Sequence, residues 1–165
     1  MKSQEVTLLD LEEKKFLPYQ VDSLLGHGGF GNVYSIKGHS NIVMKLSFCL
    51  TIKEAKKTQI VFDKIKTLKP KYVVKLFDYK FIKAKNRKTY FYYICEKLMP
   101  WDLSIDKIKV NRFIDKYEED ENSKVRAYLD KLDLYHYDLH DENIMKNSKN
   151  KFKIIDLDGF VNYSS

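Results

Sequence analysis

Short apolar runs between turn-forming residues predict strands in the first hundred residues of the chain. Three runs, YQVDSLL, NVYSI and IVMKLS, begin at Tyr19 and are separated by the glycine-rich GHGGFG and the turn KGHSN. Two further runs, VVKLFDYKFI and TYFYYICEKL, flank the polar turn AKNRK. We therefore expect an antiparallel sheet of about five strands, built from a meander and a hairpin.

Between the meander and the hairpin the apolar residues change to helical spacing. Thr51 followed by Glu54 matches a capping box, and Pro70 closes the segment. The sequence predicts a helix over residues 51–68, with an apolar stripe of Ile52, Ala55, Ile60, Phe62, Ile65 and Leu68.

After Pro100 the pattern becomes mainly helical. It predicts helices over residues 104–117 and 123–134, with the acidic EEDEN between them as a loop. The last third of the chain reads as short loops and two short strands. We expect an α+β protein divided near Met99 and Pro100 into a sheet-rich part, residues 1–99, and a helical part, residues 100–165.

Composition excludes several classes of protein. A hydrophobic content of 44% supports a packed core, and no apolar stretch is long enough for a membrane span. The start of the chain lacks the plan of a secretory signal, so we expect a soluble, cytoplasmic protein. Cys49 and Cys95 are too few for a disulfide framework or a zinc site. The net charge of +7 is spread along the chain, which argues against nucleic-acid binding.

A GxGxxG pattern lies between the first two expected strands and consists of Gly26, His27, Gly28, Gly29, Phe30 and Gly31. A dinucleotide fingerprint opens a helix and a Walker loop ends in Gly-Lys-Ser/Thr, whereas a strand follows here. Between two strands, such residues let backbone amides approach phosphate oxygens, and Val33 would offer an apolar surface to adenine. A glycine-rich hairpin turn is the alternative.

Lys45 ends the apolar run IVMK, fourteen residues after Gly31. An ammonium group at this place in a strand could reach phosphates bound by the glycine-rich residues. The alternative is an ordinary lysine at a sheet edge or facing solvent.

The segment HYDLHDENIM carries the strongest chemical signal. Asp138 and Asn143 are five residues apart, so a tight loop can aim a carboxylate at an acceptor hydroxyl and a carboxamide oxygen at magnesium. Asp156 follows thirteen residues later, at the end of the apolar run FKII. The alternatives are a polar loop, or a transition-metal site made by Asp138 with His136 and His140.

Together, the glycine-rich segment, Lys45, HYDLHDEN and IIDLDGF resemble the ordered parts of the protein-kinase superfamily, over roughly residues 19–160. The resemblance implies a kinase-like fold, with a nucleotide-binding N-lobe over residues 1–99 and a truncated C-lobe over residues 100–165. It also implies ATP and Mg²⁺ as cofactors. The site residues that it implies are Asp138, Lys45 and Asn143 for catalysis, Asn143 and Asp156 for magnesium, Glu96 and Leu98 for adenine, and Asp102 for ribose.

The chain departs from the family pattern in four ways. His140 stands where protein kinases usually carry lysine and where antibiotic and sugar kinases often carry histidine. The DFG-like triplet is Asp-Leu-Asp, beginning at Asp156. Glu54, the acidic candidate to pair with Lys45, is equally explained by the capping box. The sequence ends six residues after Gly159, so we expect neither an activation loop nor late helices.

Among protein kinases, the chain is more narrowly similar to bacterial effector kinases of the OspG and NleH type. That similarity implies a virulence effector that acts in the cytoplasm of a host cell with a host partner; a viral miniature kinase fits as well. We expect an acidic protein partner to dock on the basic helix Lys53–Lys71 or on the hairpin around Arg87.

Three functions therefore remain open. The first is a minimal serine/threonine protein kinase that uses ATP and magnesium. The second is a small-molecule kinase of the aminoglycoside or sugar type. The third is a pseudokinase-like binding module that holds a partner without catalysis.

Overall fold

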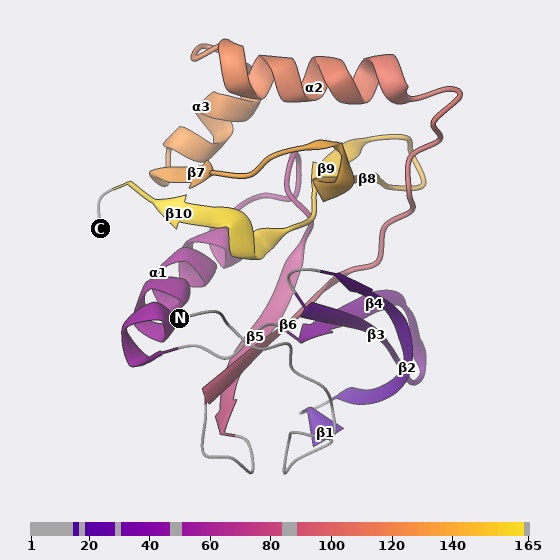
Figure 1. Ribbon diagram of the computed structural model, residues 1–165, viewed down its shortest axis with the longest axis vertical. Helices are drawn as coiled ribbons and strands as arrows, with labels where there is room; N and C mark the ends of the chain where they lie inside the picture. The colour runs from indigo at the N-terminus through magenta and orange to yellow at the C-terminus, as the bar shows by residue number, and fades with distance from the viewer. Residues whose placement is uncertain (1–14, 17–18, 29–30, 47–50, 84–88, 164–165) are drawn as a thin grey trace. The chain divides into compact units, whose positions relative to one another are not determined.

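The computed structural model describes residues 15–16, 19–28, 31–46, 51–83 and 89–163 (Figure 1). The chain forms two compact units. The first contains the described residues of Met1–Gln59 and Lys75–Lys97, and the second contains those of Ile60–Val74 and Leu98–Ser165. The chain passes from the first unit to the second between Lys97 and Leu98, and Ile60–Val74 is grouped with the C-terminal residues.

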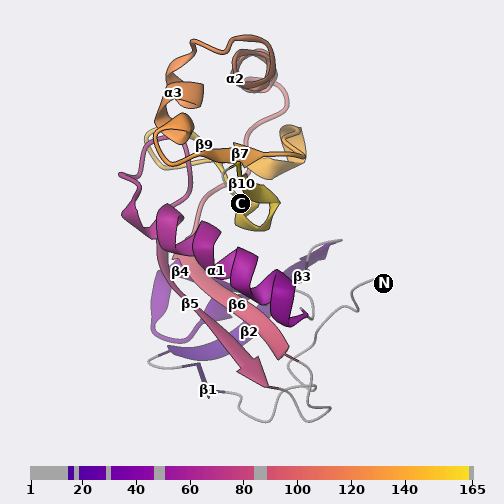
Figure 2. The same cartoon turned by 90° about the vertical axis from the view of Figure 1, so that its left-hand side faces the viewer.

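The first unit is built on an antiparallel sheet with the strand order β1-β2-β3-β4-β6-β5 (Figure 1, Figure 2). The five expected strands are all present, and a two-residue strand, β1, is added at one edge. The α+β class and the five-stranded antiparallel sheet are therefore confirmed. The strands are β1 Lys15–Phe16, β2 Tyr19–Gly28, β3 Gly31–Ile36, β4 His39–Leu46, β5 Leu76–Lys83 and β6 Thr89–Glu96.

Strand β6 lies between β4 and β5 in the interior of the sheet. Six consecutive residues, Tyr90–Cys95, are buried, which explains the continuous apolar run in the sequence. Met44 and Leu46 of β4 and Ile94 of β6 are fully buried in the core of this unit. The turn between β3 and β4 is closed by Gly38, whose positive φ of 79° favours glycine.

Helix α1, Ile52–Thr67, begins with the predicted capping box. The backbone amide of Glu54 donates to Thr51 Oγ1 over 3.2 Å, and the Thr51 hydroxyl donates to Glu54 Oε1 over 2.9 Å. The expected stripe is partly wrong, because Ile52 is 77% exposed and Ile60 is also exposed. The buried residues are Val61, Phe62 and Ile65, which all belong to the second unit.

Besides the end of α1, the described residues of the second unit form two α-helices and four short strands. The sequence predicted two strands where the structure has four, and these pair as β10 with β7 and β8 with β9. The elements are α2 Lys107–Glu119, α3 Lys124–Asp130, β7 Leu134–His136, β8 Ile144–Lys146, β9 Phe152–Ile154 and β10 Phe160–Asn162. Helix α3 ends before the predicted Leu134 because Asp133 adopts a positive φ of 54° and Leu134 begins β7.

The segment Ile60–Val74, which comprises the end of α1 and the residues after it, is tied into the second unit by backbone and side-chain hydrogen bonds. Val73 forms a parallel bridge with Ile154 of β9, and the Val74 amide donates to the Ile154 carbonyl over 2.9 Å. Lys64 Nζ donates to the Leu132 carbonyl over 2.9 Å and to Asn162 Oδ1 over 2.8 Å. Lys64 is therefore a structural residue of this unit, which corrects its assignment to an exposed docking face. Arg87 lies outside the described residues.

Within the part of the chain that the structure describes, none of the helices combines the length and apolar character that crossing a membrane requires.

Candidate active site

His136 is the central residue of the candidate site in the second unit. It is 1% exposed, at the end of β7. Its Nδ1 lies 3.3 Å from the Asp138 amide, and its Nε2 lies 2.7 Å from the Asp156 carbonyl. Because an amide can only donate and a carbonyl can only accept, Nδ1 is the acceptor and Nε2 carries the proton. Burial lowers the pKa of His136, which favours this neutral form.

Two residues fix His136 in place. The Tyr117 hydroxyl donates to the His136 carbonyl over 2.9 Å and accepts from the His136 amide over 2.6 Å. Burial raises the pKa of Tyr117, so its hydroxyl stays protonated and able to donate. A Cβ on Gly159 would lie 2.4 Å from Cε1 and Nε2 of His136, so only glycine fits against the ring.

Asp138 is fixed through its backbone while its carboxylate remains accessible. Its amide donates to His136, and its carbonyl accepts from Asn143 Nδ2 over 2.7 Å. The Asp138 side chain is nevertheless 47% exposed. The loop therefore holds the main chain of this residue and presents the carboxylate to an incoming group.

The hairpin of β8 and β9 brings Asn143 and Asp156 to the same end. Ile144 pairs with Ile154, and the Ile155 amide donates to the Asn143 carbonyl over 2.9 Å. Asn143 comes directly before β8 and Asp156 follows just after β9, and both are buried. Antiparallel pairing thus brings these two residues to the same end of the hairpin although they are thirteen residues apart in the sequence.

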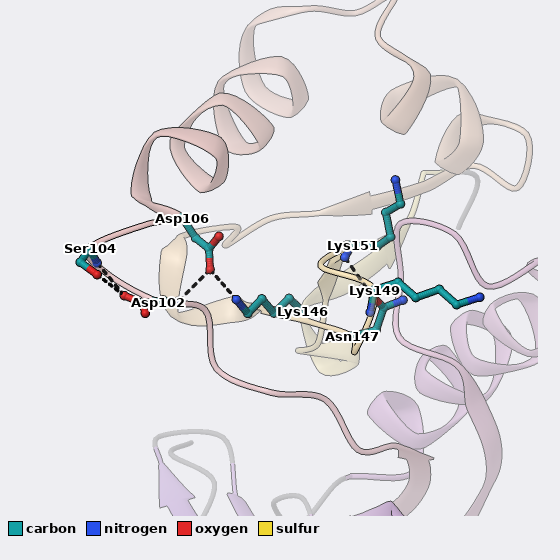
Figure 3. A network of polar contacts seen from close by, with 7 residues as sticks. All are labelled: Asp102, Ser104, Asp106, Lys146, Asn147, Lys149 and Lys151. Carbon is teal, nitrogen blue, oxygen red and sulfur yellow. Dashed lines mark hydrogen bonds and ion pairs between the residues drawn. The ribbon is translucent and has the colours of Figure 1, made fainter.

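A turn supported by Asn147 closes this hairpin, as Figure 3 shows. Asn147 Oδ1 accepts from the amides of Lys149 and Lys151, each over 2.9 Å. A side chain that binds backbone amides two and four residues ahead stabilises a tight turn. The turn fixes the pairing of β8 with β9 and, through it, the placement of Asn143 beside Asp156.

The donor set of Asn143 and Asp156 fits magnesium. The carboxamide nitrogen of Asn143 is bound to Asp138, which leaves Oδ1 as its metal-binding atom. Magnesium is commonly bound by one or two protein oxygens together with waters and substrate phosphates. Among the described residues, no group of three or more His, Cys, Asp or Glu side chains is arranged to hold a metal. A magnesium ion here would therefore depend on phosphate oxygens for much of its coordination.

His140 lies beside Asp138. Its Nδ1 accepts from the Glu142 amide over 3.2 Å, and its Nε2 lies 3.3 Å from Asn143 Nδ2. This Nε2 is 3.7 Å from Asp138 Oδ2. The alternative transition-metal site is not supported, because both ring nitrogens of His136 are bound to backbone groups.

Asp102 has a local structural role. Its Oδ1 accepts from the Ser104 amide over 2.8 Å and from the Ser104 hydroxyl over 2.6 Å, and these bonds lower the pKa of Asp102 (Figure 3). Its amide donates to Asp106 Oδ2, which also pairs with Lys146 Nζ over 2.8 Å. The sequence does not predict this ion pair, because its partners are forty residues apart and follow no periodic pattern.

In the first unit, the glycine-rich residues lie between two strands. Gly26, His27 and Gly28 end β2, and Gly28 pairs with Gly31 at the start of β3; Gly29 and Phe30 lie outside the described residues. A Cβ on Gly26 would meet nothing within 4 Å. The space around position 26 therefore does not require glycine.

Lys45 lies in an interior strand of the same sheet. In β4 it pairs with Val33 on one side and Tyr93 on the other, so it is not at a sheet edge. Its Nζ lies 5.8 Å from the centre of the Tyr93 ring. Glu96 ends β6 in this unit, whereas Leu98 and Asp102 belong to the second unit. The structure thus brings Val33 and Lys45 together as neighbours.

No protein-family model matches this sequence, and comparison with curated proteins gives no significant match. The functional argument therefore depends on the chemistry and placement of the residues described above.

Proposed function

We propose that this chain is a minimal phosphotransferase of the protein-kinase type, which transfers the γ-phosphate of ATP to a serine or threonine of a protein. The single observation that carries the proposal is the placement of Asp138. Its backbone is held by His136 and Asn143, its carboxylate is accessible, and Asn143 is joined in turn to the strand that leads to Asp156.

The second unit supplies the groups that act on the acceptor and the metal. Asp138 would orient the acceptor hydroxyl and take its proton as the oxygen–phosphorus bond forms and the bond from the γ-phosphorus to the departing ADP breaks. Asn143 Oδ1 and the Asp156 carboxylate would hold magnesium, which would neutralise charge on the phosphates. His136 positions both the proposed base and a proposed metal ligand, because its two ring nitrogens bind the backbone of Asp138 and Asp156.

The first unit supplies the groups that bind the nucleotide. Lys45 contributes a positive charge to the phosphates, and the backbone amides of Gly26–Gly31 contribute hydrogen-bond donors. Val33, adjacent to Lys45 in the sheet, offers an apolar surface to adenine. Backbone groups between Glu96 and Leu98 would bind the adenine edge, and Asp102 would contact the ribose.

A small-molecule kinase is the second candidate, and the position of His140 favours it. The His140 Nε2 lies 3.7 Å from Asp138 Oδ2, so the ring lies close to the place proposed for the acceptor hydroxyl. A hydroxyl-rich small acceptor would contact this ring directly. The identity of the labelled product separates the two candidates.

The experiment is phosphate transfer from γ-labelled ATP with magnesium, using cell lysate as the source of acceptors. Label should enter protein serine or threonine with the wild-type chain and not with Asp138→Asn, which preserves shape and removes the base. Label found only in small molecules would favour the second candidate. Failure of the wild-type chain to bind ATP at all would refute both and favour a binding module without catalysis.

A further inference from the structure

The second unit carries a basic groove along α2 and α3, which lie next to each other (Figure 1). One hollow of about 490 Å³ is lined by Lys109, Arg112 and Lys116 of α2 and by Lys124 of α3. A second hollow, of about 530 Å³, is lined by Lys69, Lys71, Lys124 and Lys131. The two hollows share Tyr72 and Lys124, so they form one continuous surface, named here the basic groove.

The basic groove is distinct from the candidate active site. None of Asp138, Asn143 and Asp156 lines either hollow. A ligand bound in the groove would therefore leave the proposed catalytic groups uncovered.

The positive charge of the groove is compensated only in part within the described part of the chain, because one carboxylate lines it and Lys109 also acts on the charge of Asp106. Asp120 is the one acidic residue among the described lining residues. None of the seven lining cations forms an ion pair with a described carboxylate. Like charges gathered on one surface repel each other, and this cost is offset when an anionic ligand binds. The charge pattern therefore indicates an acidic ligand.

The aromatic residues of the groove pack against one another. The Tyr72 ring lies edge-on to Tyr128, with centroids 5.3 Å apart, and is tilted against Phe113 at 6.3 Å. Lys71 Nζ lies 5.2 Å from the centre of the Tyr72 ring, and the Tyr128 hydroxyl donates to the Lys69 carbonyl. These half-buried rings offer apolar contact area, but not the open faces on which nucleic-acid bases stack.

We propose that the basic groove binds an acidic segment of a partner protein in which carboxylate side chains alternate with apolar ones. Carboxylates would pair with the lysines and with Arg112, whose guanidinium can bind a carboxylate through two hydrogen bonds. Apolar side chains would contact the floor formed by Tyr72 and Phe113. The proposal goes beyond phosphate transfer and does not depend on it.

Fluorescence anisotropy of the full chain without nucleotide tests the proposal. The probe is a fluorescein-labelled peptide of about ten residues, rich in glutamate with leucine at every third position; the control peptide carries lysine in place of glutamate. The acidic peptide should bind and the basic one should not. Reversing Arg112→Glu and Lys116→Glu together should weaken binding by about tenfold or more. Phe113→Ala should weaken binding without altering its dependence on salt.

A matched control separates the effect of the groove residues on binding from the effect of a change in the net charge of the protein. Lys56→Glu with Lys57→Glu makes the same change in charge on exposed residues of α1 in the first unit, and should change affinity by less than about twofold. If the reversed groove variant loses its folded circular-dichroism spectrum, Arg112→Gln with Lys116→Gln gives the same comparison.

Two outcomes would overturn the proposal. The first is equal binding of the acidic peptide by the groove variant and the wild-type chain. The second is groove-dependent binding of an oligouridine of equal charge in preference to the peptide, which would assign the surface to nucleic acid. Neither outcome bears on ATP binding, which is measured separately.

Discussion

The imidazole of His136 connects Asp138 to Asp156, because its two nitrogens bind the backbone of both residues, over 3.3 Å and 2.7 Å. One buried ring thus sets the placement of the proposed base and of a proposed metal ligand at the same time. The space beside this ring is filled by Gly159.

Gly159→Ala should destabilise the protein by about 1–3 kcal/mol, because its Cβ would lie 2.4 Å from the buried His136 ring. Chemical denaturation followed by circular dichroism measures this change. Gly26→Ala is the matched control, since a Cβ there meets nothing within 4 Å, and it should leave stability within about 0.5 kcal/mol. Equal stability of the two variants would contradict the packing described here.

Asp138→Asn should lower the rate of phosphate transfer by about 10²–10⁴-fold while leaving ATP affinity nearly unchanged, because this carboxylate acts on the acceptor. Asp156→Asn should weaken magnesium-dependent ATP binding as well as transfer. Calorimetry with and without magnesium, combined with single-turnover rates, distinguishes the two effects. Equal loss of ATP affinity in both variants would show that the roles are wrongly assigned.

Lys64→Ala should destabilise the protein by about 1–3 kcal/mol, because it leaves the Leu132 carbonyl and Asn162 Oδ1 without their donor. Lys56→Ala, an exposed lysine on the same helix, should change stability by less than about 0.5 kcal/mol. Thermal unfolding of the two variants gives the comparison. A smaller effect at Lys64 than at Lys56 would restore Lys64 to the set of docking residues.

The Asp106–Lys146 pair predicts a dependence of stability on pH. Lys146 and the Asp102 amide lower the pKa of Asp106 below its usual 3.8, so the pair stabilises the folded state above that pH. As the pH falls through the lowered pKa, the carboxylate is protonated and this contribution is lost. Lys146→Met should therefore be less stable than the wild-type chain at pH 7.

The difference between Lys146→Met and the wild-type chain should shrink as the pH falls below 3.8. Urea unfolding across this range measures it, with Lys149→Met as a control, because that exposed side chain lies on the turn after β8. A difference that stays constant with pH would exclude the ion pair as its cause.

Strands β2–β6 of the first unit could be predicted because each is six residues or longer and carries its own apolar signal between turn residues, whereas the two-residue β1 could not. The capping box correctly predicted the start of helix α1, but its apolar stripe was assigned only from the spacing of apolar residues. Ile52 and Ile60 fit that spacing and are exposed, because tertiary packing and not periodicity selects the buried face. The three-residue strands β7–β10 are too short to show any period.

The part of the candidate site whose residues lie close together in the sequence could be predicted. Asp138 and Asn143 lie in one loop, so their spacing is visible in the sequence. The bonds from His136 to Asp156 and from Tyr117 to His136 join residues about twenty positions apart and leave no pattern. The sequence shows that position 159 is glycine. Why glycine is needed there, namely the close approach of the His136 ring, can be seen only in the folded structure.

The parallel bridge between Val73 and Ile154 has a consequence for the order of folding during synthesis. The segment Ile60–Val74 leaves the ribosome long before β9, its hydrogen-bonding partner, has been translated. Contacts between residues so distant in sequence form slowly, because a long loop must close first. The nascent chain must therefore carry Val73 and Val74, both buried in the folded protein, without their partner until β9 has been synthesised.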